Sequence, residues 1–219
     1  MEKRKKAVIF GTGSFGELAY YFLTNDSEYE VVAFTETEPK KDTLFGLPVV
    51  DFQNIEKKYP PKEYEMFIAV GYAKLNKIRE KFYYEAKQKG YQLLTYISSK
   101  SSVFTDVIGD NCFIFEDNTI QPFVEIKNNV IIWSGNHIGH HTIIKSHTFI
   151  ASHAVISGHC HIKERCFIGV NATIRDGIVI EKENIIGAGA LILKNTKEKE
   201  VYAAEGTKPS LRSSEEVRI

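Results

Sequence analysis

Isoleucine recurs at every sixth position from residue 108 to residue 192, fifteen times without a miss. An α-helix repeats about every 3.6 residues and an ordinary strand every two, so neither explains a strict period of six over this length. The residue four positions after most of these isoleucines is small or β-branched, as at Val124, Thr142 and Ala172. The pattern predicts a three-sided coil, in which three hexapeptides close a turn of 18 residues and the turns stack as parallel β-structure.

The three cysteines, Cys112, Cys160 and Cys166, all stand in this second column of small residues. We therefore expect them to pack in the core, which argues against a covalent acyl-cysteine mechanism. They form no C-x-x-C motif, and an odd number of cysteines without a recognisable export signal favours reduced thiols and a cytoplasmic location.

Charge and hydropathy exclude two classes of partner. The chain has 28 Lys and Arg residues and 28 Asp and Glu residues, so its formal net charge is zero and it has no overall field to attract nucleic acid or an anionic membrane. No stretch approaches the roughly 18 consecutive apolar residues of a membrane-spanning helix. We expect neither a nucleic-acid partner nor membrane insertion.

The first 97 residues have a different pattern, in which strands and helices alternate. The expected strands are 7–10, 30–34, 48–50, 66–70 and 93–97, and the expected helices are 15–23, 51–59 and 75–89, the last one capped by Gly90. Such alternation predicts a small parallel sheet with helices on its faces. We therefore divide the chain into a Rossmann-like α/β domain (1–97), a parallel β-helix (98–200) and a C-terminal tail (201–219).

A glycine-rich loop follows the first expected strand and opens the first expected helix. Gly11, Gly13 and Gly16 form the G-x-G-x-x-G arrangement, which brings backbone N–H groups and a helix N-terminus close to a phosphate. Glu36 lies twenty residues after Gly16, at the position where an acid usually meets a ribose hydroxyl. The sheet is too small for the two halves of a dinucleotide-binding domain, so a mononucleotide diphosphate fits better than a dehydrogenase cofactor. A turn that serves packing alone is the remaining alternative.

All seven histidines lie between positions 137 and 161. His141, His147, His153 and His159 each stand three residues after a repeat isoleucine, so we expect them along a surface edge, with His159 stacked one turn from His141. Three interpretations remain open: one histidine acts as a general base, several bind a metal ion, or most are simply exposed polar residues. No pair has the H-x-x-x-x-H spacing of β-helical carbonic anhydrases, so we predict no metal.

Together these segments resemble the NeuD/PglD-like sugar acyltransferases, the group of sialic-acid O-acetyltransferases and bacillosamine N-acetyltransferases. The resemblance extends from residue 7 to about residue 209. It rests on GTGSFG, on FTETEP at 34–39, on FIAVG at 67–71, on IGHHTIIKSHTFIASHAVISGH, and on the closing segments CFIGVNATI and IIGAGALILKN. It implies that the β-helix is left-handed and that the protein is a homotrimer with active sites between adjacent β-helices.

The resemblance also implies an activity and the residues that perform it. Members of the family acetylate a nucleotide-linked amino sugar with acetyl-CoA, and the family's catalytic histidine corresponds to His140. His141 stands where an acid often orients that imidazole, which leaves the orienting group open. The implied nucleotide-sugar-binding residues are Gly11, Thr12, Gly13, Ser14, Phe15, Gly16, Glu36, Thr37 and Gly71, and the implied acetyl-CoA-binding residues are Gly158, Val170 and Ala188.

We thus expect N-acetylation of an amino sugar, and the resemblance implies a dideoxy sugar destined for a surface polysaccharide or glycan. His140 would take a proton from the attacking amine, and a backbone N–H near Gly158 would stabilise the oxyanion. The alternatives are O-acetylation of a sugar hydroxyl at the same site, a metal-dependent hydratase of the β-helical carbonic anhydrase type, and a non-catalytic nucleotide-sugar-binding trimer. The sequence leaves open whether the nucleotide is UDP, dTDP or GDP.

Overall fold

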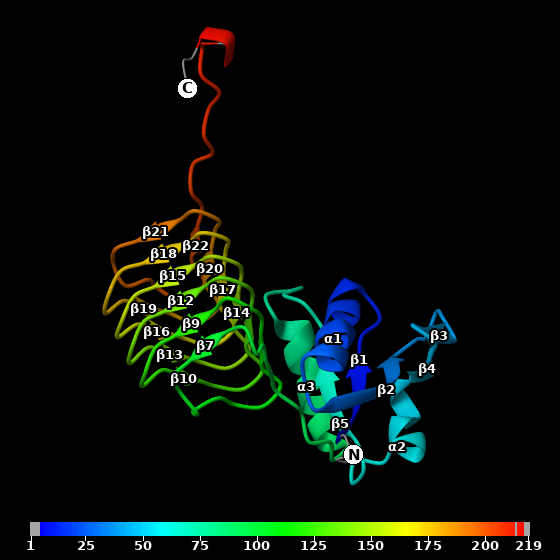
Figure 1. The fold of residues 1–219 in the computed structure, drawn as a ribbon. Helices are drawn as coiled ribbons and strands as arrows, with labels where there is room; N and C mark the ends of the chain where they lie inside the picture. Colours follow the sequence, from blue (N-terminus) through cyan, green and yellow to red (C-terminus); the bar gives the residue numbers. More distant parts are fainter. Residues whose placement is uncertain (1–4, 213, 217–219) are drawn as a thin grey trace.

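The computed structural model describes residues 5–212 and 214–216, and it places a small α/β domain beside a triangular coil of strands (Figure 1). The α/β domain has a five-stranded sheet in the order β3-β4-β2-β1-β5. Four strands, β1 (Lys5–Phe10), β2 (Tyr29–Glu36), β4 (Leu47–Asp51) and β5 (Glu65–Ile68), are parallel to one another. The fifth, β3 (Thr43–Leu44), is a short antiparallel edge strand that the sequence did not predict.

The two long helices, α1 (Ser14–Asn25) and α3 (Lys77–Gln88), pack on opposite faces of this sheet. Successive side chains of a strand point to opposite faces, so Ile9 packs in one cluster with Leu23 of α1, and Phe10 packs in the other with Tyr83 of α3. The sheet is therefore covered on both sides, as the alternating pattern predicted.

Two predicted helices differ from the observed ones. The segment 51–59 forms a 3₁₀ turn, η1 (Phe52–Asn54), followed by the short helix α2 (Ile55–Lys58). The helix predicted at 75–89 begins only at Lys77, because Lys74, Leu75 and Asn76 have φ angles of 50°, 53° and 65°. A right-handed helix has negative φ angles, so it cannot include these residues.

The rest of the chain is a left-handed parallel β-helix, as expected, in which each hexapeptide contributes one two-residue strand. The seven-stranded sheet contains β6 (Tyr96–Ile97), β8 (Phe113–Ile114), β11 (Ile131–Ile132), β14 (Phe149–Ile150), β17 (Phe167–Ile168), β20 (Ile185–Ile186) and β22 (Val201–Tyr202). The six-stranded sheet contains β7 (Ser102–Val103), β9 (Thr119–Ile120), β12 (His137–Ile138), β15 (Val155–Ile156), β18 (Thr173–Ile174) and β21 (Leu191–Ile192). The four-stranded sheet contains β10 (Glu125–Ile126), β13 (Ile143–Ile144), β16 (His161–Ile162) and β19 (Val179–Ile180).

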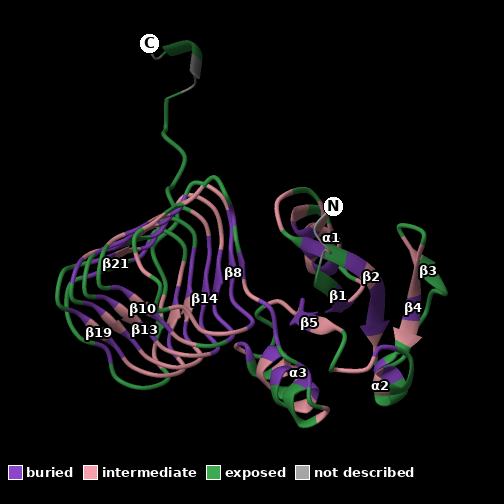
Figure 2. Cartoon of the chain, turned by 60° about the horizontal axis from the view of Figure 1, so that its bottom comes forward, coloured by how far each residue is buried: buried purple, intermediate pink, exposed green. Residues whose placement is uncertain are grey.

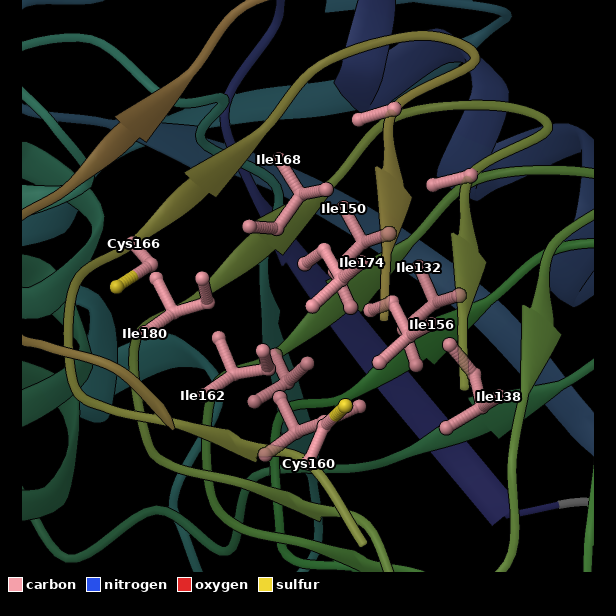
Figure 3. Packing of buried hydrophobic residues seen from close by; sticks show 14 of the residues in the cluster. Ile132, Ile138, Ile150, Ile156, Cys160, Ile162, Cys166, Ile168, Ile174 and Ile180 are labelled. Carbon is pink, nitrogen blue, oxygen red and sulfur yellow. The ribbon is translucent and has the colours of Figure 1, made fainter. Parts of the chain in front are cut away.

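The isoleucine column fills the inside of this triangle (Figure 3). From β8 to β18, each strand pairs with the strand 18 residues later, as Ile132 pairs with Ile150, so the repeat isoleucines stack turn upon turn. Fourteen of the fifteen are at most 3% exposed, and Ile108 in the first turn is partly buried. Cys112, Cys160 and Cys166 lie fully buried in the same core, as predicted.

The outward side of the seven-stranded sheet forms the docking face, which we define by Phe113, Ile131, Phe149 and Phe167. The α/β domain lies against this face of the coil (Figure 2). The side chains of the docking face belong to, or pack against, the same hydrophobic cluster as the side chains on the face of the small sheet that α1 covers. The predicted strand 93–97 is divided between the two units: Leu93 bridges to Met66, whereas β6 already pairs with β8. Only two residues connect these pairings, so the domain is attached without a flexible linker.

A buried arginine adds a polar connection between the two parts. Arg79 of α3 is fully buried, and its guanidinium donates to Asn129 Oδ1 at 3.2 Å and to the carbonyls of Asn129 at 3.3 Å, Thr148 at 3.2 Å and Gly71 at 3.0 Å. Burial lowers the pKa of Arg79 to about 9. Its donors are matched by carbonyl and amide oxygens, so one side chain fixes α3, the loop after β5 and two turns of the coil together.

The C-terminal tail was predicted from residue 201, but β22 still pairs with β20 there. Residues 203–212 then run away from the last turn as an exposed segment (Figure 1), and a 3₁₀ turn, η2 (Ser214–Glu216), follows. Residues 213 and 217–219 of the predicted tail lie outside the described part of the chain. In the described residues, no helix is both long and apolar enough to cross a membrane.

Candidate active site

The glycine loop lies at the carboxyl end of β1, where the strand order places β2 on one side and β5 on the other. Gly11 has a φ angle of 113°, and a Cβ there would lie 2.7 Å from the Ala69 carbonyl oxygen. A Cβ on Gly16 would lie 2.1 Å from the Gly11 carbonyl oxygen. Gly13 caps α1 with extended backbone and no capping side chain, so the first N–H groups of the helix are open to an anion.

Glu36 meets this loop, as the motif predicted. The Thr12 hydroxyl donates to Glu36 Oε2 at 2.7 Å, which joins the end of β2 to the loop after β1. Thr37 is the next residue and is exposed, and Gly71 follows β5 at the same edge of the sheet. The expected nucleotide-binding residues therefore come together at the carboxyl ends of β1, β2 and β5, the usual place for a nucleotide in such sheets.

The Phe15 side chain, unlike the other residues of the glycine loop, packs into the contact between the two domains. Its ring lies 5.8 Å from that of Phe67, 5.7 Å from that of Phe113 and 6.5 Å from that of Trp133 (centroid to centroid). Phe113 and Trp133 belong to the coil, so Phe15 anchors the glycine loop to the docking face. Only the backbone of Phe15 remains available for a phosphate.

His140 and His141 lie at the corner between the six-stranded and four-stranded sheets, just after β12. We call this the histidine corner and define it by His140, His141, Gly158 and His159. The Nδ1 atoms of His140 and His141 are 3.1 Å apart, and Gln121 Oε1 accepts from the His140 backbone N–H at 2.9 Å. The His141 and His159 rings stack at 4.9 Å with an interplanar angle of 14°, as the 18-residue spacing predicted.

Gly158 lies directly against the His140 imidazole. A Cβ there would lie 2.9 Å from His140 Cε1, 3.0 Å from His140 Nε2 and 3.0 Å from Asp176 Oδ1. His140, Gly158 and Asp176 follow one another at 18-residue intervals, so the absence of a side chain at Gly158 lets the imidazole and the carboxylate pack against the same backbone position. Among the described residues, the Gly158 backbone N–H has no hydrogen-bond acceptor.

The other histidines divide between exposed and buried positions. His137 and His161 lie on β12 and β16, and His153 occupies another corner of the coil. The expectation that the whole register lies on a surface edge is wrong for His147, which is 3% exposed because α3 covers it. Its Nδ1 contacts the Asn129 amide nitrogen at 2.8 Å, and burial lowers the pKa of His147 to about 4.

The residues implied for acetyl-CoA do not meet within one chain. Gly158 belongs to the histidine corner, whereas Val170 and Ala188 follow β17 and β20 at the corner between the seven-stranded and six-stranded sheets. Val170 is 43% exposed and open to a ligand. The cysteines provide no alternative acyl carrier, because burial raises the pKa of Cys112 and of Cys166 to about 12 and also raises that of Cys160.

Comparison with protein families covers most of the chain. Residues 6–86 match the PglD N-terminal domain, and residues 123–158 and 159–194 match the bacterial transferase hexapeptide (six repeats). With a nucleotide-type loop on one domain and histidines on the other, the fold defines a hexapeptide-repeat transferase with a PglD-type N-terminal domain. The chain belongs to the NeuD/PglD-like sugar acyltransferases.

Solved structures have the same fold over nearly the full length. The acetyltransferase domain of PglB from Neisseria gonorrhoeae is 22% identical with a TM-score of 0.82, and the match covers 94% of this chain and 100% of that one. A variant of perosamine N-acetyltransferase from Caulobacter crescentus, in complex with CoA and GDP-perosamine, is 21% identical with a TM-score of 0.80 over 92% of this chain and 97% of that one. WeeI from Acinetobacter baumannii is 22% identical with a TM-score of 0.75, over 89% of this chain and 94% of that one.

Two residues beside the site were not singled out from the sequence. Asp176 stands two turns from His140 in the same register, so the 18-residue spacing would have found it. Arg79 holds the carbonyl of Gly71, but nothing in a helix sequence shows that one of its arginines is buried.

Proposed function

We propose that the protein is an acetyl-CoA-dependent N-acetyltransferase of a nucleotide-linked amino sugar, with His140 as the general base. The observation that carries this proposal is the position of the His140 ring, with Nδ1 beside His141 and the Cε1–Nε2 edge beside Gly158. A neutral imidazole has one N–H and one lone pair. When His140 donates its Nδ1–H to His141 Nδ1, Nε2 keeps the lone pair and can act as the base. His141 then acts as the positioning residue in place of the acid common in the family.

The histidine corner and Asp176 have the groups that amide formation needs. An ammonium group on the sugar is attracted by the Asp176 carboxylate, which lies beside Gly158 and has no such attraction for a neutral hydroxyl, and it loses its extra proton to water. The neutral amine nitrogen then attacks the thioester carbonyl carbon, the Nε2 lone pair of His140 accepts the amine proton, and the carbon–sulfur bond breaks. The thiolate of CoA leaves and takes up that proton. The Gly158 N–H supports the negative oxygen that forms in between.

We propose a homotrimer, as the family resemblance implies, and the positions of the two halves of the site support a site shared between copies. The α/β domain docks on the seven-stranded sheet, whereas the histidine corner joins the other two sheets and so lies across the coil from it. A triangle with six residues per side is roughly 15–20 Å across. A sugar nucleotide held at Gly11 of one copy therefore meets His140 of an adjacent copy. The same assembly brings Gly158 of one copy toward Val170 and Ala188 of another, which forms the acetyl-CoA groove.

The remaining parts of the proposal concern setting and substrate. We keep a cytoplasmic location, supported by the three free cysteines, and a role in surface polysaccharide or glycan biosynthesis. The nucleotide is UDP, dTDP or GDP, and the sugar is an amino sugar, most simply a dideoxy one. The limits of the two domains lie near the expected residues 97 and 200, with β6 (Tyr96–Ile97) and β22 (Val201–Tyr202) assigned to the coil because they pair with its strands.

The test is acetyl transfer by the full-length protein from acetyl-CoA to a panel of UDP-, dTDP- and GDP-linked amino sugars, with the product identified by mass spectrometry. An amide persists in mild alkali, whereas an ester from O-acetylation is cleaved. The His140→Ala variant should lose roughly two to four orders of magnitude in kcat. His161→Ala, which removes an imidazole from β16 of the four-stranded sheet, outside both corners of the proposed site, is the matched control and should retain activity. Near-normal turnover of His140→Ala, or no turnover of any amino sugar by the unaltered protein, would refute the proposal.

A further inference from the structure

Three imidazoles converge at the histidine corner, and acetyl transfer does not use all of them. His140 and His141 come from one turn of the coil and His159 from the next, and all three side chains are exposed. One ring nitrogen from each lies within 4.8 Å of the others. Among the described residues, this is the one group of histidine, cysteine and acidic side chains close enough to share a metal ion.

The spacing fits a transition-metal ion. Zinc–nitrogen bonds are about 2.0–2.1 Å long, so two ligand nitrogens in a tetrahedral site stand roughly 3.3 Å apart. The Nδ1 atoms of His140 and His141 are 3.1 Å apart, which is close to that separation. The His159 ring lies 4.9 Å from each of the other two rings (centroid to centroid) and is free to turn toward them because it is exposed.

The donor set decides which ions fit. Three neutral imidazoles with a position left for water are a common set for Zn²⁺, and imidazole also suits Cu²⁺, Ni²⁺ and Co²⁺. Mg²⁺ and Ca²⁺ prefer oxygen ligands and have none within this triad. The backbone holds the ligands in place, since His141 and His159 both occupy left-handed corner positions, with φ angles of 58° and 56°.

We propose that His140, His141 and His159 form a binding site for a divalent transition-metal ion of the zinc class, and that the bound ion inhibits acetyl transfer. The inhibition rests on the proposed function, whereas the site itself does not. A neutral imidazole has one lone pair, so His140 cannot both ligate a metal and accept a proton from the amine. Whichever ring nitrogen binds the ion, the other carries a proton, and the base is lost until the ion leaves.

The test separates metal binding from inhibition. Co²⁺ is titrated into metal-free full-length protein while its visible absorption is recorded, and Zn²⁺ binding is followed by calorimetry. The key variant is His159→Asn, because asparagine already occupies left-handed corners at Asn111, Asn129 and Asn171. The matched control is His153→Asn, which makes the same change at a corner outside the triad, where φ is 59°.

The unaltered protein and His153→Asn should each bind one ion per chain. His159→Asn should bind the ion at least about 30-fold more weakly, because removing a residue that merely hydrogen-bonds a metal ligand already lowers metal affinity by roughly 10–100-fold. Acetyl transfer is then measured with and without Zn²⁺ by mass spectrometry of the sugar product, because the thiol of free CoA also binds zinc. Zn²⁺ should inhibit the unaltered enzyme and EDTA should restore it, whereas the turnover of His159→Asn, measured relative to its own metal-free rate, should resist Zn²⁺.

Three results would overturn the inference: no binding by the unaltered protein, equal binding by His159→Asn, or full turnover with the triad occupied. If no amino sugar in the panel is acetylated, the proposed function fails. In that case, Co²⁺ binding that depends on His159 still supports the metal site.

Discussion

Gly158 and Gly139 lie one turn apart beside the histidine corner, yet adding a methyl group to each should have opposite consequences. In Gly158→Ala the new Cβ would lie 2.9 Å from His140 Cε1 and 3.0 Å from Nε2, both atoms of an exposed side chain. Ordinary carbon contacts are about 3.5–4.0 Å, so the ring must retreat by roughly 0.5–1 Å. A misplacement of about 1 Å costs up to 100-fold, so we expect kcat to fall roughly 10–100-fold, or about 1.4–2.7 kcal/mol of activation free energy.

Stability should be nearly unchanged in Gly158→Ala, because the backbone needs no movement. In Gly139→Ala the new Cβ would lie 2.4 Å from the Gly158 nitrogen and 2.5 Å from the Ser157 carbonyl carbon, both backbone atoms. That variant should unfold more easily, by roughly 1–3 kcal/mol. The assay pairs kcat for acetyl transfer with urea unfolding for both variants. Full turnover by Gly158→Ala with unchanged stability would refute the view that the chemistry depends on the His140 ring in its position beside Gly158.

Three further changes test the fold around the site. The pKa of His147 is about 4 in the folded protein against 6.5 ordinarily, so on acidification the unfolded chain takes up a proton before the folded one does. The free energy of unfolding of the unaltered protein should therefore drop by roughly 1–2 kcal/mol between pH 7 and pH 5 through this residue alone. His147→Asn should lack this drop, so its stability should depend less on pH. Urea unfolding at both pH values measures it, and equal slopes with and without His147 would contradict the assignment. Arg79→Met should destabilise the contact between the two domains by roughly 2–4 kcal/mol, because the buried oxygens of Gly71, Asn129 and Thr148 lose their hydrogen-bond donor. A melting temperature equal to that of the unaltered protein would count against this. Ile150→Ala removes a fully buried side chain from the column and should cost about 2–5 kcal/mol in urea unfolding, whereas a loss below about 1 kcal/mol would show that the core is not close-packed there.

The sequence predicted the coil better than the domain in front of it, and the reason is physical. A column of isoleucines at a fixed period admits few structures, so register, core and the stacking of His141 on His159 followed from spacing alone. The α/β domain depends on local signals that tertiary packing overrides. Lys74, Leu75 and Asn76 adopt left-handed backbone conformations. The Asn76 side-chain amide donates a hydrogen bond of 3.0 Å to the carbonyl of Cys166, a residue 90 positions further along the sequence.

The candidate site shows the same division. The glycine loop, Glu36 and the stacking of His141 on His159 lie where motif and spacing put them. The burial of His147 did not follow from its register, because the repeat specifies a corner but not which corner α3 covers. The use of Phe15 as an anchor was also beyond the motif, which describes the backbone of the loop and not the surface behind it.

The short passage from Leu93 to β6 has a consequence for how such an enzyme can diversify. With two residues between the sheets and Arg79 buried across the contact, the nucleotide loop has no hinge on which to swing. Its tilt is set by the bulk of the aromatic rings under it, such as Trp133 and Phe149. Under the proposed function, resizing one of these rings would therefore retune which sugar carbon is presented to the histidine corner.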